Sequence, residues 1–349
     1  MIAADRPDHP AARLCAVDAD GRIRHLPRAA LATVLTRGDL VVANDAATLP
    51  ASLHGLHAAT GRPVEVRLAG WVAPGDPTRF AALVFGAGDH RLRTEDRPAP
   101  PDLAAGDHLS LGPLNAVVER GLGHPRLVRL RFLGRRNRVL AGLARHGRPV
   151  QYAHVPEPLA LWDVWTRIAA DPVAFEPPSA GFALDWALLA AWRRHGIGFA
   201  TLTHAAGISS TGDAALDRRL PFDEPYRIPE ATATAVAQAK AAGRRVVAIG
   251  TTVVRALEAA AGEDGSVRAG DGVAANRIGP GTRLRVADAL LTGMHQPGES
   301  HFELLRAFAP GGVLDGLPAA LTAAGYRGHE FGDVMLIERQ AREAGSVAA

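Results

Sequence analysis

The stretch Arg244-Arg245-Val246-Val247-Ala248-Ile249-Gly250-Thr251-Thr252-Val253-Val254-Arg255-Ala256-Leu257-Glu258 predicts the fold of this chain. Four apolar residues, most of them β-branched, follow two arginines and are typical of a buried parallel strand. The Gly-Thr-Thr triplet then leads into a helical pattern. A strand, a tight turn and a helix start expose backbone N–H groups at a positive dipole end, which suits a carboxylate, a phosphate or ribose oxygens. The same pattern also fits an ordinary capped helix of an α/β layer.

The composition is that of a globular protein. The chain has 349 residues, 47% of them apolar, which is enough for two domains with a sizeable core. No apolar run approaches the roughly 20 residues of a membrane span, and no apolar segment near Met1 is typical of a signal peptide. We therefore expect a cytoplasmic protein without membrane contact. Because Cys15 is the only cysteine and the histidines form no HExxH motif, we also expect no metal site.

The positive charge is carried almost entirely by arginine, since Lys240 is the only lysine. One segment holds eight arginines and no acidic residue: Arg126, Arg129, Arg131, Arg135, Arg136, Arg138, Arg145 and Arg148. Such a local excess suits contact with nucleic-acid phosphates. The alternative is a solvated face in a chain that uses arginine in place of lysine.

The order of the expected elements places an all-β region inside an α/β chain. Residues 38–45 are a predicted strand that ends in Asn44 and Asp45, at the edge where α/β sheets bind ligands, although an Asx turn uses the same residue types. Short segments separated by Gly, Pro and Asp predict a small barrel or sandwich before residue 149. Beyond it we expect helices at 159–170, 185–195 and 229–242, a strand at 198–204, an irregular polar segment at 209–229 and a frayed tail from 338.

We therefore predict an α/β main domain with an inserted small antiparallel β-barrel domain. The main domain would comprise residues 1–51 and 156–349, and the barrel residues 52–155.

Six motifs, in this order, resemble those of one family, the S-adenosylmethionine:tRNA ribosyltransferase-isomerases of queuosine biosynthesis. They are Gly38-Asp39-Leu40-Val41-Val42-Ala43-Asn44-Asp45 with Leu49-Pro50-Ala51, Pro178-Ser179-Ala180-Gly181, Thr201-Leu202 with Gly207, Gly250-Thr251-Thr252 with Arg255 and Leu257-Glu258, Thr292 with His295 and Pro297, and Tyr326-Arg327 with residues 331–337. The resemblance covers nearly the whole chain. It implies an α/β domain interrupted by a small β-barrel, in agreement with the element order.

The resemblance also implies a reaction without a metal. The family transfers the ribosyl part of S-adenosylmethionine to an aminomethyl-deazaguanine of tRNA, rearranges it, and releases adenine and methionine. The sulfonium acidifies the adjacent 5′ carbon, so that a positioned base can remove a proton there. By this resemblance the arginine-rich segment would contact tRNA through Arg126, Arg129, Arg131, Arg135, Arg136 and Arg138.

The resemblance and the residue chemistry together predict site roles. Gly250-Thr251-Thr252 would hold the methionine or ribose end of S-adenosylmethionine, and Pro178-Ser179-Ala180-Gly181 would let backbone approach it closely. His295 is the expected general base, Glu224 a partner for the incoming amine or a second base, and Asp45 an orienting acceptor. Asn44, His204 and Arg255 complete the predicted cofactor-binding set. Asp333 is either structural or in contact with ligand.

Departures from the family pattern leave three hypotheses open. The family's Asn-Asp-Thr-Arg is here Asn44-Asp45-Ala46-Ala47, its Leu-His-Val-Gly is Leu202-Thr203-His204-Ala205, and its His-x-Met-His-x-Glu keeps only Glu224. The chain is either a diverged tRNA enzyme in which His204 covers for lost histidines, or an S-adenosylmethionine-using enzyme with a small-molecule or other non-tRNA acceptor, or a non-catalytic S-adenosylmethionine-binding protein. The retained Asp45, Glu224 and His295 argue against the third hypothesis.

Overall fold

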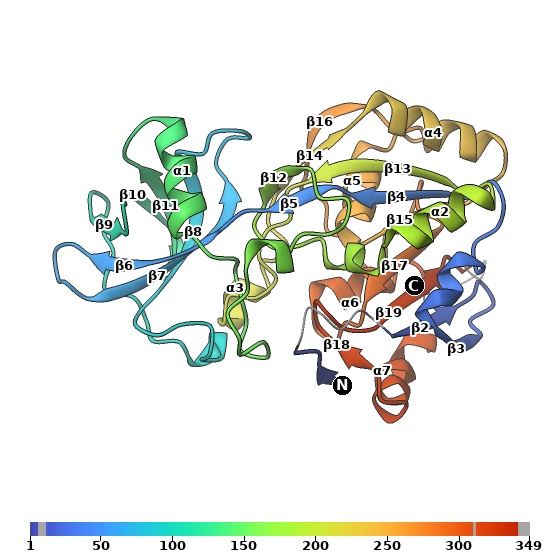
Figure 1. Cartoon of the computed structure of the whole chain (residues 1–349), viewed down its shortest axis with the longest axis horizontal. Helices are drawn as coiled ribbons and strands as arrows, with labels where there is room; N and C mark the ends of the chain where they lie inside the picture. Colours follow the sequence, from blue (N-terminus) through green and yellow to red (C-terminus); the bar gives the residue numbers. More distant parts are fainter. Residues whose placement is uncertain (6–11, 310–311, 341–349) are drawn as a thin grey trace, which may run out of the picture.

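A computed structural model describes residues 1–5, 12–309 and 312–340 of the chain. Its described elements form a nine-stranded sheet flanked by helices and a closed six-stranded barrel (Figure 1). Neighbouring barrel strands are all antiparallel. The predicted fold class, an α/β main domain with an inserted antiparallel β-barrel, is confirmed.

The large sheet has the order β16-β14-β13-β4-β15-β17-β19-β2-β3. Four central strands run parallel, namely β13 (Gly198–His204), β4 (Leu40–Asn44), β15 (Val246–Ile249) and β17 (Ala289–Gly293). The outer strands are β2 (Arg13–Val17), β3 (Ile23–Pro27), β14 (Glu224–Ile228), β16 (Gly270–Ala274) and β19 (Val334–Glu338). Because the four central strands are parallel, their carboxyl ends meet at one edge of the sheet.

Helices cover both faces of this sheet, as the apolar run of β15 requires. Val246 and Ala248 pack in one core with α4 (Glu230–Ala241), α5 (Thr251–Ala260), α6 (Ser300–Leu305) and α7 (Val313–Ala323). Val247 and Ile249 pack in a second core with the 3₁₀ helices η1 (Arg28–Ala32) and η4 (Ser179–Ala183) and with α2 (Trp186–Arg194). Alternate residues of a strand point to opposite faces, so a strand buried on both sides is continuously apolar. Cys15 lies in the first core, and burial raises the pKa of its thiol to about 11.

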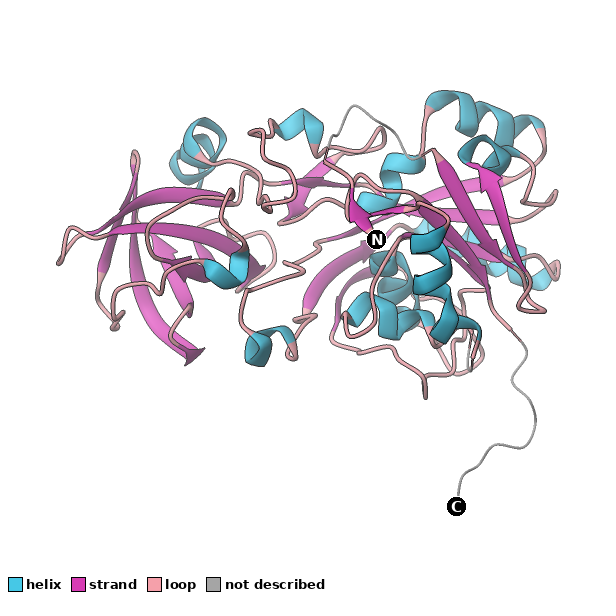
Figure 2. Ribbon diagram, turned by 90° about the horizontal axis from the view of Figure 1, so that it is seen from below, coloured by secondary structure: helices cyan, strands magenta, loops and turns pink. Residues whose placement is uncertain are grey.

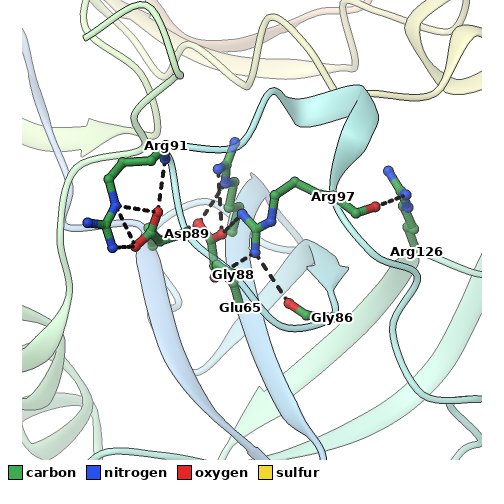
Figure 3. A network of polar contacts seen from close by, with 9 residues as sticks. Glu65, Gly86, Gly88, Asp89, Arg91, Arg97 and Arg126 are labelled. Carbon is green, nitrogen blue, oxygen red and sulfur yellow. Dashed lines mark hydrogen bonds and ion pairs between the residues drawn. The ribbon is translucent and has the colours of Figure 1, made fainter. Parts of the chain in front are cut away.

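The barrel closes in the order β10-β11-β8-β7-β6-β9. Its strands are β6 (Ser52–His57), β7 (Pro63–Trp71), β8 (Arg79–Phe85), β9 (His108–Leu111), β10 (Leu114–His124) and β11 (Leu127–Phe132), and α1 (Arg136–His146) packs beside β10. A buried ion cluster joins Glu65 to Arg67 and Arg97 (Figure 3). Burial acts to raise the pKa of Glu65, but the two guanidinium groups lower it to about 2.

The chain passes between the two parts in an extended run through β4, β5 (Ala46–Thr48) and β6 (Figure 1). Strand β12 (Asp171–Ala174) pairs with β5 in parallel. The indole N–H of Trp71, at the end of β7, donates to the Val173 carbonyl at 2.8 Å. The view in Figure 2 places the barrel to one side of the large sheet, joined by loops and short elements.

Two predicted segments differ from the structure. The helix expected at 159–170 is wrong, since only the 3₁₀ turn η3 (Leu161–Asp163) forms there. The segment instead bonds to β5, because the Trp165 indole donates to Thr48 O and the Thr48 hydroxyl donates to Val164 O. The polar segment 209–229 contains α3 (Ala214–Asp217) and the paired strand β14.

Short elements complete the described fold. They are β1 (Ile2–Ala3), which pairs with β18 (Arg327–Gly328), and the turn η2 (Thr94–Asp96). Strand β19 ends at Glu338, and most of the expected tail, 341–349, lies outside the described residues. No helix in the described ranges has the length and apolar character of a membrane span.

Candidate functional site

The carboxyl edge of the four parallel strands brings together most of the predicted site residues. Asn44 ends β4, His204 ends β13, Gly250 follows β15, and Thr292 lies near the end of β17. These strands are neighbours in the sheet, so residues as far apart in sequence as Asn44 and Thr252 come into contact.

Asn44 is the hub of this edge. Its amide group donates to the His204 carbonyl at 2.9 Å and to the Thr252 hydroxyl at 3.3 Å. Its Oδ1 accepts from the backbone N–H groups of Ala46 at 3.0 Å and His204 at 2.9 Å. The side chain is 2% exposed, so Asn44 uses its hydrogen-bonding capacity to fix the ends of β4, β13 and α5. Beside it, Asp45 accepts from the Thr203 hydroxyl at 2.7 Å.

The start of α5 follows Gly250, whose φ of 95° lies in the left-handed region that favours glycine. Among the described residues, no side chain caps this helix. The N–H groups of Thr251 and Thr252 in its first turn therefore present positive partial charge at the carboxyl edge of the sheet, beside the hydroxyl of Thr252.

Segment 178–181 lies next to this helix start. A Cβ placed on Gly250 would stand 3.6 Å from the Ala180 Cβ, so η4 and α5 are neighbours. Close packing requires a glycine at position 181, because a Cβ there would approach the Thr166 methyl group to 2.8 Å. The backbone at Gly181 thus approaches a protein side chain closely.

A buried cluster stands behind the edge. Arg255 of α5 pairs with Glu224, and both residues are under 10% exposed. The guanidinium also donates to the carbonyls of Ala274 at 2.6 Å, Phe222 at 3.1 Å and Asn276 at 3.3 Å. Glu224 Oε1 accepts from the Gly207 N–H at 2.5 Å. Arg255 therefore ties the loop before β14 to the end of β16, and protein acceptors take four of its five N–H donors.

His204 faces this pair, with Nε2 3.6 Å from Glu224 Oε2. The imidazole is fully buried, and burial together with the charge of Arg255 lowers the pKa of His204 to about 3. It is therefore neutral at physiological pH. Neither ring nitrogen has a hydrogen-bond partner among the residues that the structure describes.

His295 lies just beyond β17. Its Nε2 is 2.8 Å from the Thr292 hydroxyl, and its Nδ1 is 3.7 Å from a carboxylate oxygen of Glu299. The His301 ring lies 4.9 Å from the His295 ring, centroid to centroid, and burial followed by the charge of His295 lowers the pKa of His301 to about 3. An imidazole held between a hydroxyl and a carboxylate has the arrangement of an oriented base.

Asp333 is structural. Its carboxylate accepts from the backbone N–H groups of Ala12, Arg13 and Arg327 at 2.9 to 3.2 Å. It thereby fixes the start of β2 and the turn before β19.

Five residues that the sequence reasoning missed form a second polar cluster. The Tyr152 hydroxyl donates to Glu176, His154 Nε2 lies 2.8 Å from Glu330 Oε2, and the rings of His154 and His329 stack with centroids 4.2 Å apart. Ligand atoms of His154, His329 and Glu330 all lie within 4.8 Å of one another, so these three could hold a metal ion. The expectation of no metal stays a prediction. The one sequence signal was the position of the cluster residues beside two family motifs, Glu176 before Pro178 and His329-Glu330 after Tyr326-Arg327.

The protonation of Glu176 should make stability depend on pH. Burial raises the pKa of Glu176 to about 7, whereas an unfolded glutamate titrates near 4.5. The folded protein thus keeps this proton to a higher pH than the unfolded chain does. The free energy of unfolding therefore falls as pH rises from about 4.5 to about 7, by up to about 3 kcal/mol. Urea unfolding should show Glu176→Gln gaining stability over the parent as pH rises from 5 to 8. A difference that does not change with pH would contradict this assignment.

The predicted RNA-contacting arginines divide into two groups. Arg126 is half-buried and donates to the Arg97 carbonyl at 2.8 Å (Figure 3). Its guanidinium group lies over the Phe85 ring. Burial lowers the pKa of Arg126. Arg129 and Arg131 lie on the outer face of β11, where Arg131 is paired opposite Arg79 of β8. Arg135, Arg136 and Arg138 are exposed at the start of α1.

Comparison with known proteins gives consistent matches. A family model described as queuosine biosynthesis protein matches residues 2–337. The S-adenosylmethionine:tRNA ribosyltransferase-isomerase of Sorangium cellulosum is 35% identical over 96% of this chain and 95% of the relative. That of Thiobacillus denitrificans is 32% identical over 98% and 95%. The crystal structure of S-adenosylmethionine tRNA ribosyltransferase from Thermotoga maritima is 22% identical, with a TM-score of 0.49 over 97% of this chain and 95% of that one.

Proposed function

The chain belongs to the family of queuosine biosynthesis proteins, and we propose that it is a transferase-isomerase that uses S-adenosylmethionine as ribosyl donor to a deazaguanine-modified tRNA. The products would be adenine and methionine, and the enzyme would act in the cytoplasm. The observation that carries the proposal is the meeting of Asn44, Thr252 and His204 at the carboxyl edge of the parallel strands. This edge is the usual ligand site of an open α/β sheet.

The donor would bind at the start of α5. The first-turn N–H groups and the Thr252 hydroxyl suit the carboxylate of the methionine part or the ribose oxygens. Segment 178–181 would form the adjacent wall, because Ala180 approaches Gly250. Asp45 would accept hydrogen bonds from the ribose or from the acceptor base. The unpartnered nitrogens of buried His204 support a ligand or water contact there.

Other predicted residues would act through position or proton transfer. His295 would remove the proton next to the sulfonium, with Thr292 and Glu299 orienting its ring. Arg255 and Glu224 would hold the wall behind the site, since their carboxylate and guanidinium groups already bond to protein atoms. We therefore assign these two a positioning role in place of direct contact with the donor or the amine.

Adenine release tests the proposed function. The protein would be incubated with S-adenosylmethionine alone, with unmodified tRNA and with tRNA that bears the aminomethyl-deazaguanine. We expect release only with the modified tRNA. Adenine release that does not depend on tRNA would instead favour a small-molecule acceptor. Binding of S-adenosylmethionine without adenine release would favour a non-catalytic protein.

Replacing Thr252 with alanine should weaken S-adenosylmethionine binding. Loss of one hydrogen bond to a charged group corresponds to about 1.5–3 kcal/mol, or roughly 10- to 150-fold in Kd. Calorimetry would measure this, with Thr234→Ala as control because Thr234 is an exposed threonine on α4. Equal affinities for the two variants would remove Thr252 from the donor site.

Arginines on the barrel would supply the contact with tRNA. Arg131 and Arg79 lie next to Phe80, which pairs with Trp71 at the junction with the main domain. The guanidinium of Arg136 donates to Gly75 O, in the connection between β7 and β8. Arg129, Arg131, Arg135, Arg136 and Arg138 would therefore extend the site along the barrel. Arg126 would instead serve packing on the outer face of β8, where Phe85 packs in one cluster with Ile208 and Leu216.

The triple variant Arg135→Gln/Arg136→Gln/Arg138→Gln should bind tRNA more weakly and with less salt dependence. Each lost phosphate contact lowers the slope of log Kd against log salt by about 0.7–0.9. Filter binding at several salt concentrations would measure the slope. The matched control replaces Arg22, Arg193 and Arg194, which are exposed on the main domain. The same slope in both triple variants would refute the barrel contact.

A further inference from the structure

Two histidines and one glutamate of the second polar cluster have the side-chain types of a metal site. One ring nitrogen of His154, one of His329 and a carboxylate oxygen of Glu330 all lie within 4.8 Å of one another. In the described ranges, no other group of three or more histidine, cysteine, aspartate or glutamate side chains has this arrangement. Two imidazole nitrogens and one carboxylate oxygen suit zinc, whose fourth ligand at such a site is a water molecule.

The three ligand atoms are close to the spacing that a bound ion requires. Atoms that each lie about 2.1 Å from a tetrahedral ion are about 3.4 Å apart. His154 Nε2 and Glu330 Oε2 are 2.8 Å apart, so an ion between them would separate them slightly. The neutral tautomer with its proton at Nδ1 leaves Nε2 of His154 available as a ligand. His329 is exposed, so a small rotation of its side chain can complete the set.

Neighbouring rings orient both imidazoles. The His154 ring is stacked with the Tyr152 ring, within 9° of parallel, and with the His329 ring, at a centroid distance of 4.2 Å. His329 is also the one non-glycine residue with positive φ in the described part of the chain. Groups that hold the rings of metal-binding histidines contribute to metal affinity.

A small cavity lies beside the three residues. Its volume is about 20 Å³, which is room for one water molecule, and its lining includes His154, Glu176 and Glu330. Apolar side chains at residues 150, 155, 159, 164 and 331 form much of the remaining wall. A water molecule in this cavity would be the fourth ligand of the ion, with Glu176 as its hydrogen-bond partner.

The three ligands come from two segments that are far apart in the sequence. His154 follows α1, in the connection by which the chain returns from the barrel to the large sheet. His329 and Glu330 lie between β18 and β19, and β19 belongs to the large sheet. An ion bound by all three would therefore join this connection to the sheet.

We propose that His154, His329 and Glu330 form a zinc-binding site that fixes the connection from the barrel to the large sheet. The site is separate from the edge at Thr252 and does not rest on the proposed function. It replaces the expectation, drawn from sequence, that the chain has no metal site.

Calorimetric titration of the EDTA-treated and dialysed protein with ZnCl₂ tests the site. We expect one zinc ion to bind per chain. The variants His154→Gln, His329→Asn and Glu330→Gln should each weaken binding about 100-fold or more, since loss of a group that only orients a ligand already costs about 10- to 100-fold. Asparagine is used at position 329 because it tolerates a positive φ.

Matched controls remove one exposed histidine or one exposed glutamate. His195→Gln and Glu157→Gln should bind zinc as the parent does. Unfolding temperatures measured in EDTA would establish that every variant is folded. Added ZnCl₂ should raise the unfolding temperature of the parent and of both controls but not of the three site variants, because an ion that binds the folded state stabilises it.

Two results would overturn the proposal. One is an absence of zinc binding to the parent. The other is binding that any of the three site variants retains at the parent's affinity, because that residue would then be no ligand. Co²⁺ in place of zinc gives a second measurement, since the strong visible absorption of a four-coordinate ion is absent when Co²⁺ binds the surface adventitiously with six ligands.

Discussion

His295→Ala is expected to slow tRNA-dependent adenine release about 100-fold or more. A positioned general base contributes about 10²- to 10⁴-fold to a proton transfer. His295 lies between the Thr292 hydroxyl and the Glu299 carboxylate, so its ring is held in place at the carboxyl edge of the sheet. Single-turnover adenine release with saturating S-adenosylmethionine would isolate the chemical step.

The control for this variant is His195→Ala. His195 is exposed after α2, just before β13 begins, and so lies at the amino edge of the sheet, away from the site. Its replacement should leave the rate unchanged. A rate for His295→Ala within a few-fold of the parent would exclude His295 as the base and direct attention to the other titratable residues of the edge.

Arg255→Met is expected to destabilise the fold by about 3–5 kcal/mol. Removing one partner of a buried ion pair leaves the other charge uncompensated, and Glu224 has little exposure. The carbonyls of Phe222 and Ala274 also lose their donor. Urea unfolding monitored by circular dichroism would give the free energy of unfolding.

This loss should depend on pH in a defined direction. Burial raises the pKa of Glu224 and Arg255 acts against that rise, so without Arg255 the pKa of Glu224 goes higher. A carboxyl group whose folded pKa is raised loses stability as pH increases, and the deficit of Arg255→Met should be smaller at pH 5 than at pH 8. Adding Glu224→Gln should recover part of the loss at pH 8. A deficit that is equal at both pH values, with no recovery in the double variant, would refute the buried-charge explanation.

Local sequence patterns predicted a structural element correctly where the residues of that element alone determine its conformation. The run Val246–Ile249 is apolar on both faces of a strand, and Gly250 has the left-handed φ that the turn requires. The helix predicted after Asp185 forms because that side chain caps it at Leu188. The helix predicted at 159–170 from sequence pattern does not form, because hydrogen bonds of Trp165 and Thr48 hold the segment against β5.

The sequence by itself determined the fold class, the family and the edge at which Asn44 and Gly250 lie, since each of these two residues follows a predicted strand. Only the tertiary structure decided which polar side chains are already hydrogen-bonded to other protein groups. It shows that four of the five N–H donors of Arg255 are taken by Glu224 and three carbonyls, that Asp333 is bound to three amides, and that Arg126 donates to the Arg97 carbonyl. It also joined His154 to Glu330 across 176 residues. Contacts between distant segments depend on how strands and loops pack in three dimensions, and no spacing in the sequence encodes them.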